Sequence, residues 1–492
     1  MSPYIILSIF LLYTALIFII TYFTSRKANN ESFYVGNKVS PWYVVAYGMI
    51  GASLSGVTFM SVPGWVSSTH FTYLVLVAGY LVGYAVIATI LLPLYYRLNL
   101  TSIYTYLEQR FGFWTYKSGA AFFMLSRTIG ASLRLFLVVN VMQIFVFDAW
   151  NVPFWLNVFI FIGLIILYTF KGGIKTIVWT DTLQTTFMLG AVVLCIHYIL
   201  KDLNVDFGTM LDTVIKSDYS QIIETDWHNK TYFLKHFLGG AFIAISMTGL
   251  DQEMMQKNLS CRNVKEAKIN MITFSWILVF INMMFLFLGA ILNIYAASQT
   301  IDTMGSTDNL FPAIAINHLT PVAGIVFLIG LISAAYPSAD GALTSLTTSF
   351  TIDFLGLPQH KGLTDTQKRK IRYGVHIGIA SIFFILILFF RTVNDKAVID
   401  KIFTLAGYTY GPLLGLFSYG LFTKWKIYDK WVPLVVILSP IITHILNMNS
   451  KAWLSGYIFG FELIIVNGML TFLGLFLIRK KKIEAEGGKA KG

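Results

Sequence analysis

Long apolar segments recur along the whole chain and are separated by short polar stretches. A helix needs about 20 apolar residues to cross a bilayer, and thirteen segments reach or approach that length. They cover residues 3–24, 41–66, 71–96, 116–147, 152–170, 176–200, 233–256, 266–297, 321–355, 371–392, 404–423, 431–448 and 453–478. The pattern therefore predicts an all-α integral membrane protein with about 13 transmembrane helices.

Composition narrows the class further. Of the 492 residues, 56% are hydrophobic and only 12% are charged, whereas soluble domains carry about 25% charged residues. This excludes a string of soluble domains, a fibrous protein and a disordered chain. The net charge of +12 lies in short loops rather than on one soluble face, so we expect membrane lipid and no nucleic acid as a partner. Two cysteines imply no disulfide framework.

The distribution of Lys and Arg predicts the orientation of the helices, because short cytoplasmic loops are enriched in both. With the N-terminus outside, 26 of the 36 Lys and Arg residues fall in inside loops, Lys257 among them, and eight fall outside. This makes residues 201–232 the longest outside loop. It also makes residues 480–492 a cytoplasmic tail of a multi-pass cell-membrane protein.

Small residues crowd the second apolar segment, whose centre reads GMIGASLSGVTFMSVPG. Glycine lowers helix propensity, and proline removes a backbone donor. Two interpretations follow. Either these residues allow close packing of helices, or the helix is broken near Gly51–Gly56 and its freed carbonyls bind Na⁺.

The ninth segment combines small, hydroxyl and charged residues in the run SAAYPSADGALTSLTTSF. Ala334 and Ser338 share one helical stripe, and Pro337 leaves the carbonyl of Ser333 without its usual partner. Hydroxyls and free carbonyls suit a hard cation. The alternative is that the small residues only form a contact with another helix. Asp340 weighs against this alternative, because such a contact needs no carboxylate.

Ionisable residues inside the membrane are costly and mark function. Asp181, at the start of the sixth segment, either caps or docks a helix end or takes part in an ion site. Arg127 and Arg134 lie seven residues apart on one helix face. Three roles are open: they pair with Asp181 and Asp340, one of them extends its charged end to the membrane surface, or one of them meets an anionic substrate.

Seven motifs resemble those of the sodium/solute symporter family, which includes bacterial sialic acid, proline and sugar symporters and the animal sodium/glucose transporters. They are ESFYVGNKVSPWYV, ASLSGVTFMSVPG, NLTSIYTYLEQRFG, GGIKTIVWTDTLQ, LDQEMMQKNLSCRN, SLTTSFTIDFLG and YGPLLGLF. The resemblance implies a leucine-transporter-type fold with two inverted repeats of five helices, residues 41–200 and 233–425. Residues 1–30 then add one extra helix, and residues 426–479 add two.

The resemblance also implies ion sites. The main Na⁺ site would use the carbonyls of Gly51, Leu54 and Ala334 and the hydroxyl of Ser338. Some members hold a second Na⁺ between an aspartate that matches Asp181 and serines of the ninth segment. Here Pro337, Asp340 and Gly341 stand in place of those serines. Asp340 therefore brings a carboxylate where a hydroxyl is expected, which implies either a second Na⁺ site or a protonatable one.

The implied solute pocket lies beside the broken helix and would be formed by Ser55, Thr58, Tyr73, Met247 and Phe403. In sialic acid symporters, an arginine that holds the carboxylate aligns near Gly130 or Ala131 of this chain. The resemblance therefore gives less support to sialic acid as the solute. Arg134 still leaves an anionic solute possible.

Together these features predict a secondary transporter in which Na⁺ is the coupling ion. It would carry a small organic solute (a sugar, an amino acid or a carboxylate) by alternating access. We find no buried nucleophile with a base, so we do not expect an enzyme. The alternatives are a non-transporting membrane sensor on the same scaffold and a proton-coupled carrier.

Overall fold

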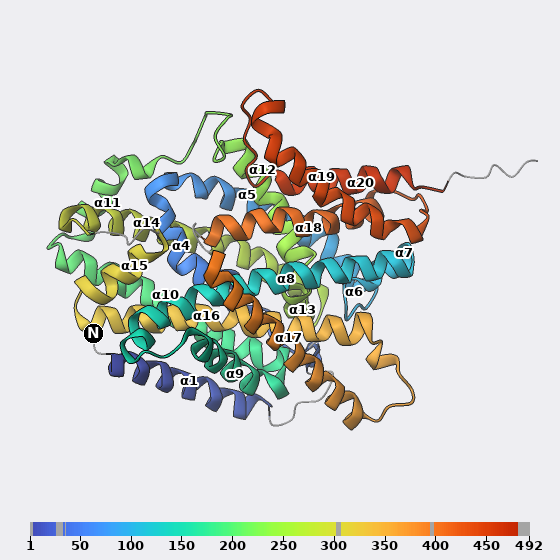
Figure 1. Cartoon of the computed structure of the whole chain (residues 1–492), viewed down its shortest axis with the longest axis horizontal. Coiled ribbons are helices and arrows are strands. Elements are labelled where there is room, and N and C mark those ends of the chain that lie inside the picture. The colour runs from blue at the N-terminus through green and yellow to red at the C-terminus, as the bar shows by residue number, and fades with distance from the viewer. Residues whose placement is uncertain (1–2, 26–32, 35, 302–306, 394–397, 481–492) are drawn as a thin grey trace, which may run out of the picture.

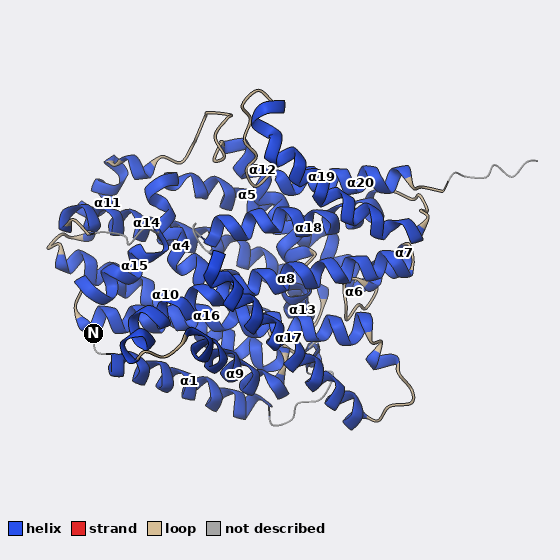
Figure 2. Cartoon of the chain, viewed as in Figure 1, coloured by secondary structure: helices blue, strands red, loops and turns tan. Residues whose placement is uncertain are grey.

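The computed structural model describes residues 3–25, 33–34, 36–301, 307–393 and 398–480. Within these ranges the protein is helical and has no strand; there are only two isolated β-bridges, Ser40 with Cys261 and Ile427 with Arg479 (Figure 2). The all-α prediction is confirmed. Most of the predicted tail, residues 481–492, lies outside the described residues.

Helices occupy every predicted apolar segment. They are α1 (Pro3–Ser25), α3 (Trp42–Ser53), α4 (Gly56–Thr69), α5 (Tyr73–Val86), α6 (Leu92–Arg97), α8 (Phe113–Met142), α9 (Phe154–Gly172), α10 (Ile174–Asp202), α12 (Phe233–Ala244), α13 (Gln252–Leu259), α14 (Val264–Gln299), α16 (Pro321–Ser349), α17 (Asp365–Val393), α18 (Val398–Phe422), α19 (Val432–Trp453) and α20 (Leu463–Leu477). In the described part of the chain, eight helices are long and apolar enough to cross a membrane, or nine if one bent pair counts as a span. The number thirteen stays a prediction.

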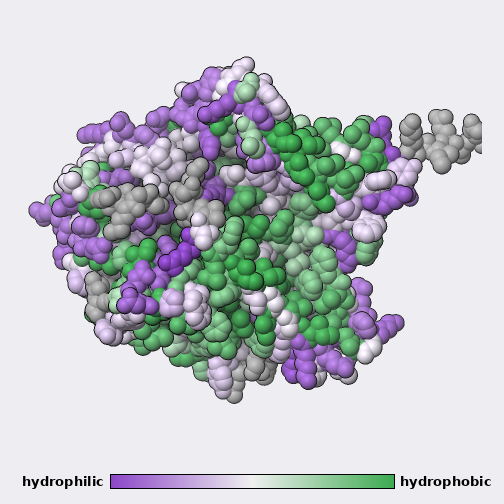
Figure 3. All heavy atoms as spheres, in the orientation of Figure 1, coloured by the Kyte–Doolittle hydropathy of each residue, from purple (hydrophilic) through white to green (hydrophobic). Residues whose placement is uncertain are grey.

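The surface agrees with a membrane protein. On the face in Figure 3, hydrophobic residues fill a broad middle band, and hydrophilic residues gather toward the two ends of the long axis. Short helices lie at these ends (Figure 1): α11 (Phe207–Lys216) at one and α7 (Thr105–Arg110) at the other. Large apolar side chains are exposed on the candidate membrane spans, such as Leu12 at 73% and Ile385 at 63%. Patches of this kind suit hydrocarbon rather than water.

The first broken helix is confirmed. Helix α3 ends at Ser53 and α4 begins at Gly56, and between them Leu54 and Ser55 leave helical geometry, with ψ angles of 81° and 178°. Helix α3 also packs very closely on α10. The N–H of Gly51 donates to Thr185 Oγ1 at 3.0 Å, and a Cβ on Gly51 would lie 2.5 Å from that oxygen. Glycine at this position therefore fixes the spacing of the two helices.

A second broken helix was not predicted. The segment Phe233–Gly249, formed by α12 and η7 (Ile245–Gly249), is bent by 64° relative to α13. Asp251 caps α13, because its carboxylate accepts from the N–H groups of Glu253 at 2.9 Å and Met254 at 3.2 Å. The polar run DQEMMQK lies at this break, where hydropathy alone predicts only the end of a span and the start of a loop.

Candidate functional site

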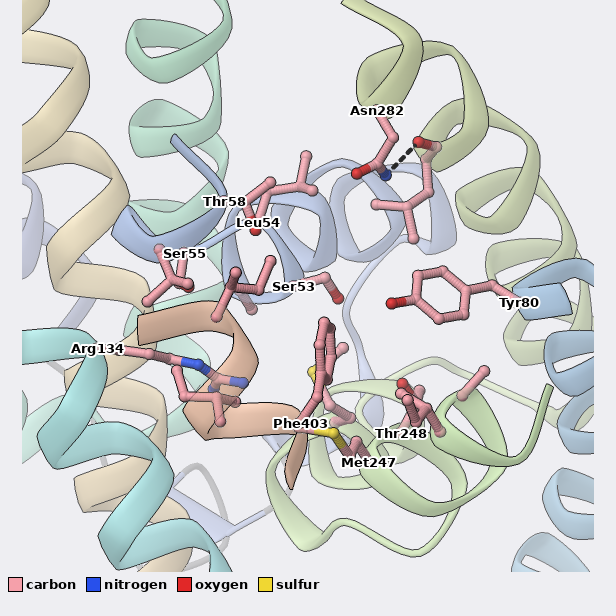
Figure 4. Close-up of a pocket in the computed structure, with 18 of the residues that line it drawn as sticks. Ser53, Leu54, Ser55, Thr58, Tyr80, Arg134, Met247, Thr248, Asn282 and Phe403 are labelled. Carbon is pink, nitrogen blue, oxygen red and sulfur yellow. Dashed lines mark hydrogen bonds between the residues drawn. The ribbon is translucent and has the colours of Figure 1, made fainter. Parts of the chain in front are cut away.

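A cavity of about 90 Å³ lies between the two breaks. All five residues expected to meet the solute line it, together with Leu54 and both arginines of α8 (Figure 4). Three tyrosines of α5, Tyr73, Tyr80 and Tyr84, and the π-helical turn with Met247 and Thr248 complete the wall. The sequence therefore identified the lining of one cavity, and the binding roles of these residues stay predictions.

Positive electrostatic features converge on this cavity. Arg134 reaches toward it from α8 (Figure 4) and forms no hydrogen bond or ion pair with any residue that the structure describes. Helix α4 also begins at the cavity, and the side chain of Ser55 does not cap it. The first N–H groups of a helix without a cap are free to bind an anion, and the helix dipole favours negative charge there.

The predicted main Na⁺ ligands lie on helices that pack together. Helix α16, with Ala334 and Ser338, contacts both α3 and α4, and both residues are fully buried. At the break, the carbonyls of Gly51 and Leu54 accept no backbone hydrogen bond from the described residues. Ser338 Oγ donates to the Ala335 carbonyl at 2.9 Å, so its lone pairs remain available. The break thus supplies the free oxygens that a Na⁺ site needs.

A buried charge cluster lies beside the second break. Lys257 Nζ is 2.7 Å from Asp181 Oδ2 and 3.4 Å from Glu253 Oε1. Arg127 forms an ion pair with Glu253 and lies 3.8 Å from Asp251. These five side chains are at most 4% exposed.

Two expectations are wrong here. Arg127 pairs with Glu253 and Asp251 rather than with Asp181 or Asp340, and Lys257 is buried rather than in a loop. The bend before α13 explains both differences. The bend turns α13 into the bundle. Glu253 then faces α8, and Lys257, one helical turn later, faces α10.

Asp340 extends this cluster. Tyr168 donates a hydrogen bond to Asp340 Oδ2 at 2.7 Å, whereas Asp340 Oδ1 and Asp181 Oδ1 find no hydrogen-bond partner among the described residues. Gly341 gives room for the neighbouring carboxylate, because a Cβ there would lie 2.3 Å from Glu253 Oε1.

The charges of the cluster do not balance. Asp181, Asp251, Glu253 and Asp340 are buried with two cationic partners, Arg127 and Lys257. Even with the charge of Arg134 included, the carboxylates outnumber the cations. Buried charges need partners, so this arrangement can accept an added cation or proton.

Residues 33–427 match the sodium:solute symporter family. The chain belongs to this family. The resemblance of the motifs is thereby confirmed, and the chain is a membrane transporter that couples the symport of a solute to Na⁺. The non-transporting sensor is not favoured.

Two known relatives each share about a quarter of the aligned residues with this chain. The sodium/sialic acid symporter of Aliivibrio fischeri is 24% identical over 418 residues, 82% of this chain and 80% of the relative. The human sodium/iodide cotransporter is 24% identical over 419 residues, 80% of this chain and 61% of the relative.

Solved structures show the same fold. The substrate-bound, outward-open structure of a Na⁺-coupled sialic acid symporter has a TM-score of 0.82 at 20% identity and covers 97% of this chain and 99% of that one. The closed structure of Mhp1, a nucleobase-cation-symport-1 family transporter, has a TM-score of 0.59 at 13% identity, with 92% and 94% covered.

Replacing Lys257 by Met is expected to lower the free energy of unfolding by about 3–5 kcal/mol, because Asp181 and Glu253 lose their buried ammonium partner. The double variant Lys257→Met/Asp181→Asn should recover part of this loss. Thermal unfolding in detergent measures both, and Lys265→Met, at an exposed position, is the control. Equal stability of Lys257→Met and the control would show that the ion pair does not hold the bundle.

Proposed function

We propose that the solute is a small organic anion with a carboxylate, carried with Na⁺ across the cell membrane. The observation that carries this proposal is Arg134, a cation without an ion pair among the described residues, on the wall of a cavity where α4 also begins. Charge-assisted hydrogen bonds from arginine to a carboxylate are strong and directional. The names of the sialic acid, iodide and monocarboxylate carriers among the relatives support an anion.

The size of the cavity supports a small solute. Pockets for drug-sized ligands measure about 300–1,000 Å³, and this cavity measures about 90 Å³. A short carboxylate therefore fits better than a sugar. An amino acid would also bring an ammonium group toward Arg134, which like-charge repulsion disfavours.

The fold proposed for transport is the inverted repeat of residues 41–200 and 233–425, with thirteen spans and a cytoplasmic C-terminus. One feature supports the repeat: the helix that opens each half is broken, α3–α4 in the first and α12–α13 in the second. In such folds, solute and ions bind at the broken helices. Alternating access would then open this cavity to one side of the membrane at a time.

The proposed main Na⁺ site consists of the carbonyls of Gly51, Leu54 and Ala334 and the hydroxyl of Ser338. An ion there would tie the first break to α16. Because the same break forms the wall of the cavity, Na⁺ would order the solute site, and the solute would in turn improve Na⁺ binding.

Asp181 and Asp340 form the proposed second coupling site, which takes either a second Na⁺ or a proton. The excess of buried carboxylates and the two oxygens without hydrogen bonds support it. Either ion reduces the negative charge of the cluster.

The experiment that tests the anionic solute is thermal stabilisation of the purified protein by short monocarboxylates, with and without Na⁺. A ligand at 100 times its Kd stabilises by about 2.7 kcal/mol. Arg134→Gln is expected to weaken carboxylate binding about 10- to 100-fold, since a hydrogen bond to a charged group contributes about 1.5–3 kcal/mol. Stabilisation by Na⁺ alone should persist in this variant.

Arg97→Gln, at an exposed arginine, is the matched control and should bind as the parent does. Stabilisation by uncharged sugars but not by carboxylates would overturn the anionic solute. Equal effects of Na⁺, K⁺ and choline would instead contradict the Na⁺ sites.

Ser338→Ala removes a hydroxyl from the proposed main site. It is expected to raise the Na⁺ concentration for half-maximal stabilisation about tenfold, because one ion ligand is lost at about 1.4 kcal/mol. Ser345→Ala, about two helical turns further along the same face of α16 with a similar bond to the Ala342 carbonyl at 3.0 Å, is the control. An unchanged Na⁺ dependence would remove Ser338 from the site.

Asp340→Asn tests the second site. If the site takes Na⁺, the dependence on Na⁺ concentration should become less steep; if it takes a proton, the pH dependence of solute binding should flatten. Asp353→Asn is the control, because Asp353 is equally buried and accepts a bond from Tyr116 at 2.9 Å. A variant that keeps both dependences would exclude Asp340 from ion coupling.

A further inference from the structure

Two cavities have linings that contact each other through aromatic side chains. The outer cavity, of about 830 Å³, lies under the loop of residues 201–232 and is far larger than the central one. Trp65 and Phe461 line the outer cavity, whereas Tyr73 and Phe403 line the central cavity. These four side chains, which we call the aromatic lid, therefore stand between the two spaces.

The rings of the aromatic lid contact one another in a chain. The centroids of Phe403 and Phe461 are 4.9 Å apart in an edge-on arrangement. Trp65 lies 6.1 Å from Phe461 and 6.1 Å from Tyr73. Phe461 thus connects α18 with α4 through its ring.

Phe461 comes from an unexpected place, the segment between α19 and α20, which follows the last helix of the proposed repeats. It is only 7% exposed although it lies outside a helix. Its ring stacks on His236 of α12 at 5.5 Å, with 14° between the planes. A Cβ on Gly239 would lie 2.9 Å from Phe461 Cβ, so the segment is in close contact with α12.

Polar contacts hold the rest of the segment in place. Lys235 Nζ donates to the carbonyls of Ile458 at 2.8 Å and Asn229 at 3.1 Å, and it lies 3.7 Å above the ring of Tyr457. Tyr457 in turn donates to Glu462 Oε1 at 2.8 Å. Contacts of the residues before and after Phe461 therefore fix its position. Its ring is held in the protein and does not lie loosely on the surface.

We propose that Phe461 is a gate residue of this transporter: its ring closes the passage between the outer and the central cavity and must leave for a solute to enter. Helix α18, which carries Phe403, packs along α20. A movement of α18 relative to α4 must therefore break the contact of Phe461 with Phe403 or its contact with Trp65. This gives the α19–α20 pair a direct part in the transport cycle. The proposal does not depend on the nature of the solute or on the Na⁺ sites.

The test uses a cysteine in the central cavity and a membrane-impermeant thiol reagent added to intact cells. Ser55→Cys provides the cysteine, and the native Cys195 and Cys261 are buried and give the background. Phe461→Ala is expected to speed labelling of this cysteine about tenfold, equivalent to about 1.4 kcal/mol. Phe459→Ala is the matched control, because Phe459 lies in the same segment and lines the outer cavity but pairs only with Tyr457 among the described rings.

A second cysteine separates gating from loss of fold. Ser68→Cys lines the outer cavity, on the near side of the aromatic lid, so its labelling rate should be equal with and without Phe461→Ala. Equal labelling of Ser55→Cys with and without Phe461→Ala would overturn the proposal. A rise in the labelling of both cysteines would also overturn it, since it would indicate general loosening of the outer half.

Discussion

The ion pair between Lys257 and Asp181 is the contact on which the inner half of the bundle depends. It joins α13 to α10 at 2.7 Å, with both side chains out of reach of solvent. An unpaired charge at this depth costs several kcal/mol, so α13 can turn away from the axis of α12 only where such partners meet it. Arg127 adds α8 to the same point through Glu253 and Asp251. One set of charges therefore positions three helices and the second break.

The two breaks create opposite electrostatic environments a short way apart. Beside α13, carboxylates exceed cations, whereas the central cavity has Arg134 and the start of α4. We infer that a bound cation would offset the excess of carboxylates beside α13. A bound anion would offset the charge of Arg134 at the central cavity. The two ligands would be coupled because the same broken helices form both environments, so that binding of one ligand changes the affinity for the other.

The half of the bundle that the charge pattern predicts to face outward is closed in a different way. There, aromatic rings rather than charges lie between the cavities, and their contacts are weak individually. Edge-on ring contacts can separate without leaving an unpaired charge behind, which suits a gate better than an ion pair does. The charge cluster beside α13 and the aromatic lid thus differ in how readily their contacts would separate.

The sequence alone determined the features that depend on local composition. Apolar length predicted where the helices lie, because a membrane span needs a run of about 20 apolar residues. Gly, Ser and Pro in the second segment predicted the first break, since they weaken a helix wherever they occur. The motifs then led to the cavity lining, including Phe403, and Arg134 stood out as an ionisable residue within an apolar segment.

Only the tertiary structure decided which charges meet and which loop covers the cavity. Arg127 and Glu253 are 126 positions apart, and no local pattern distinguishes Glu253 from Asp340 as the partner. Lys257 resembled a loop residue because hydropathy cannot tell a polar turn that leaves the membrane from one that folds back into the bundle. Phe461 was one aromatic residue among many in an apolar segment. Its place in the aromatic lid follows from the packing of α20 on α18, and packing is a property of pairs of surfaces rather than of single segments.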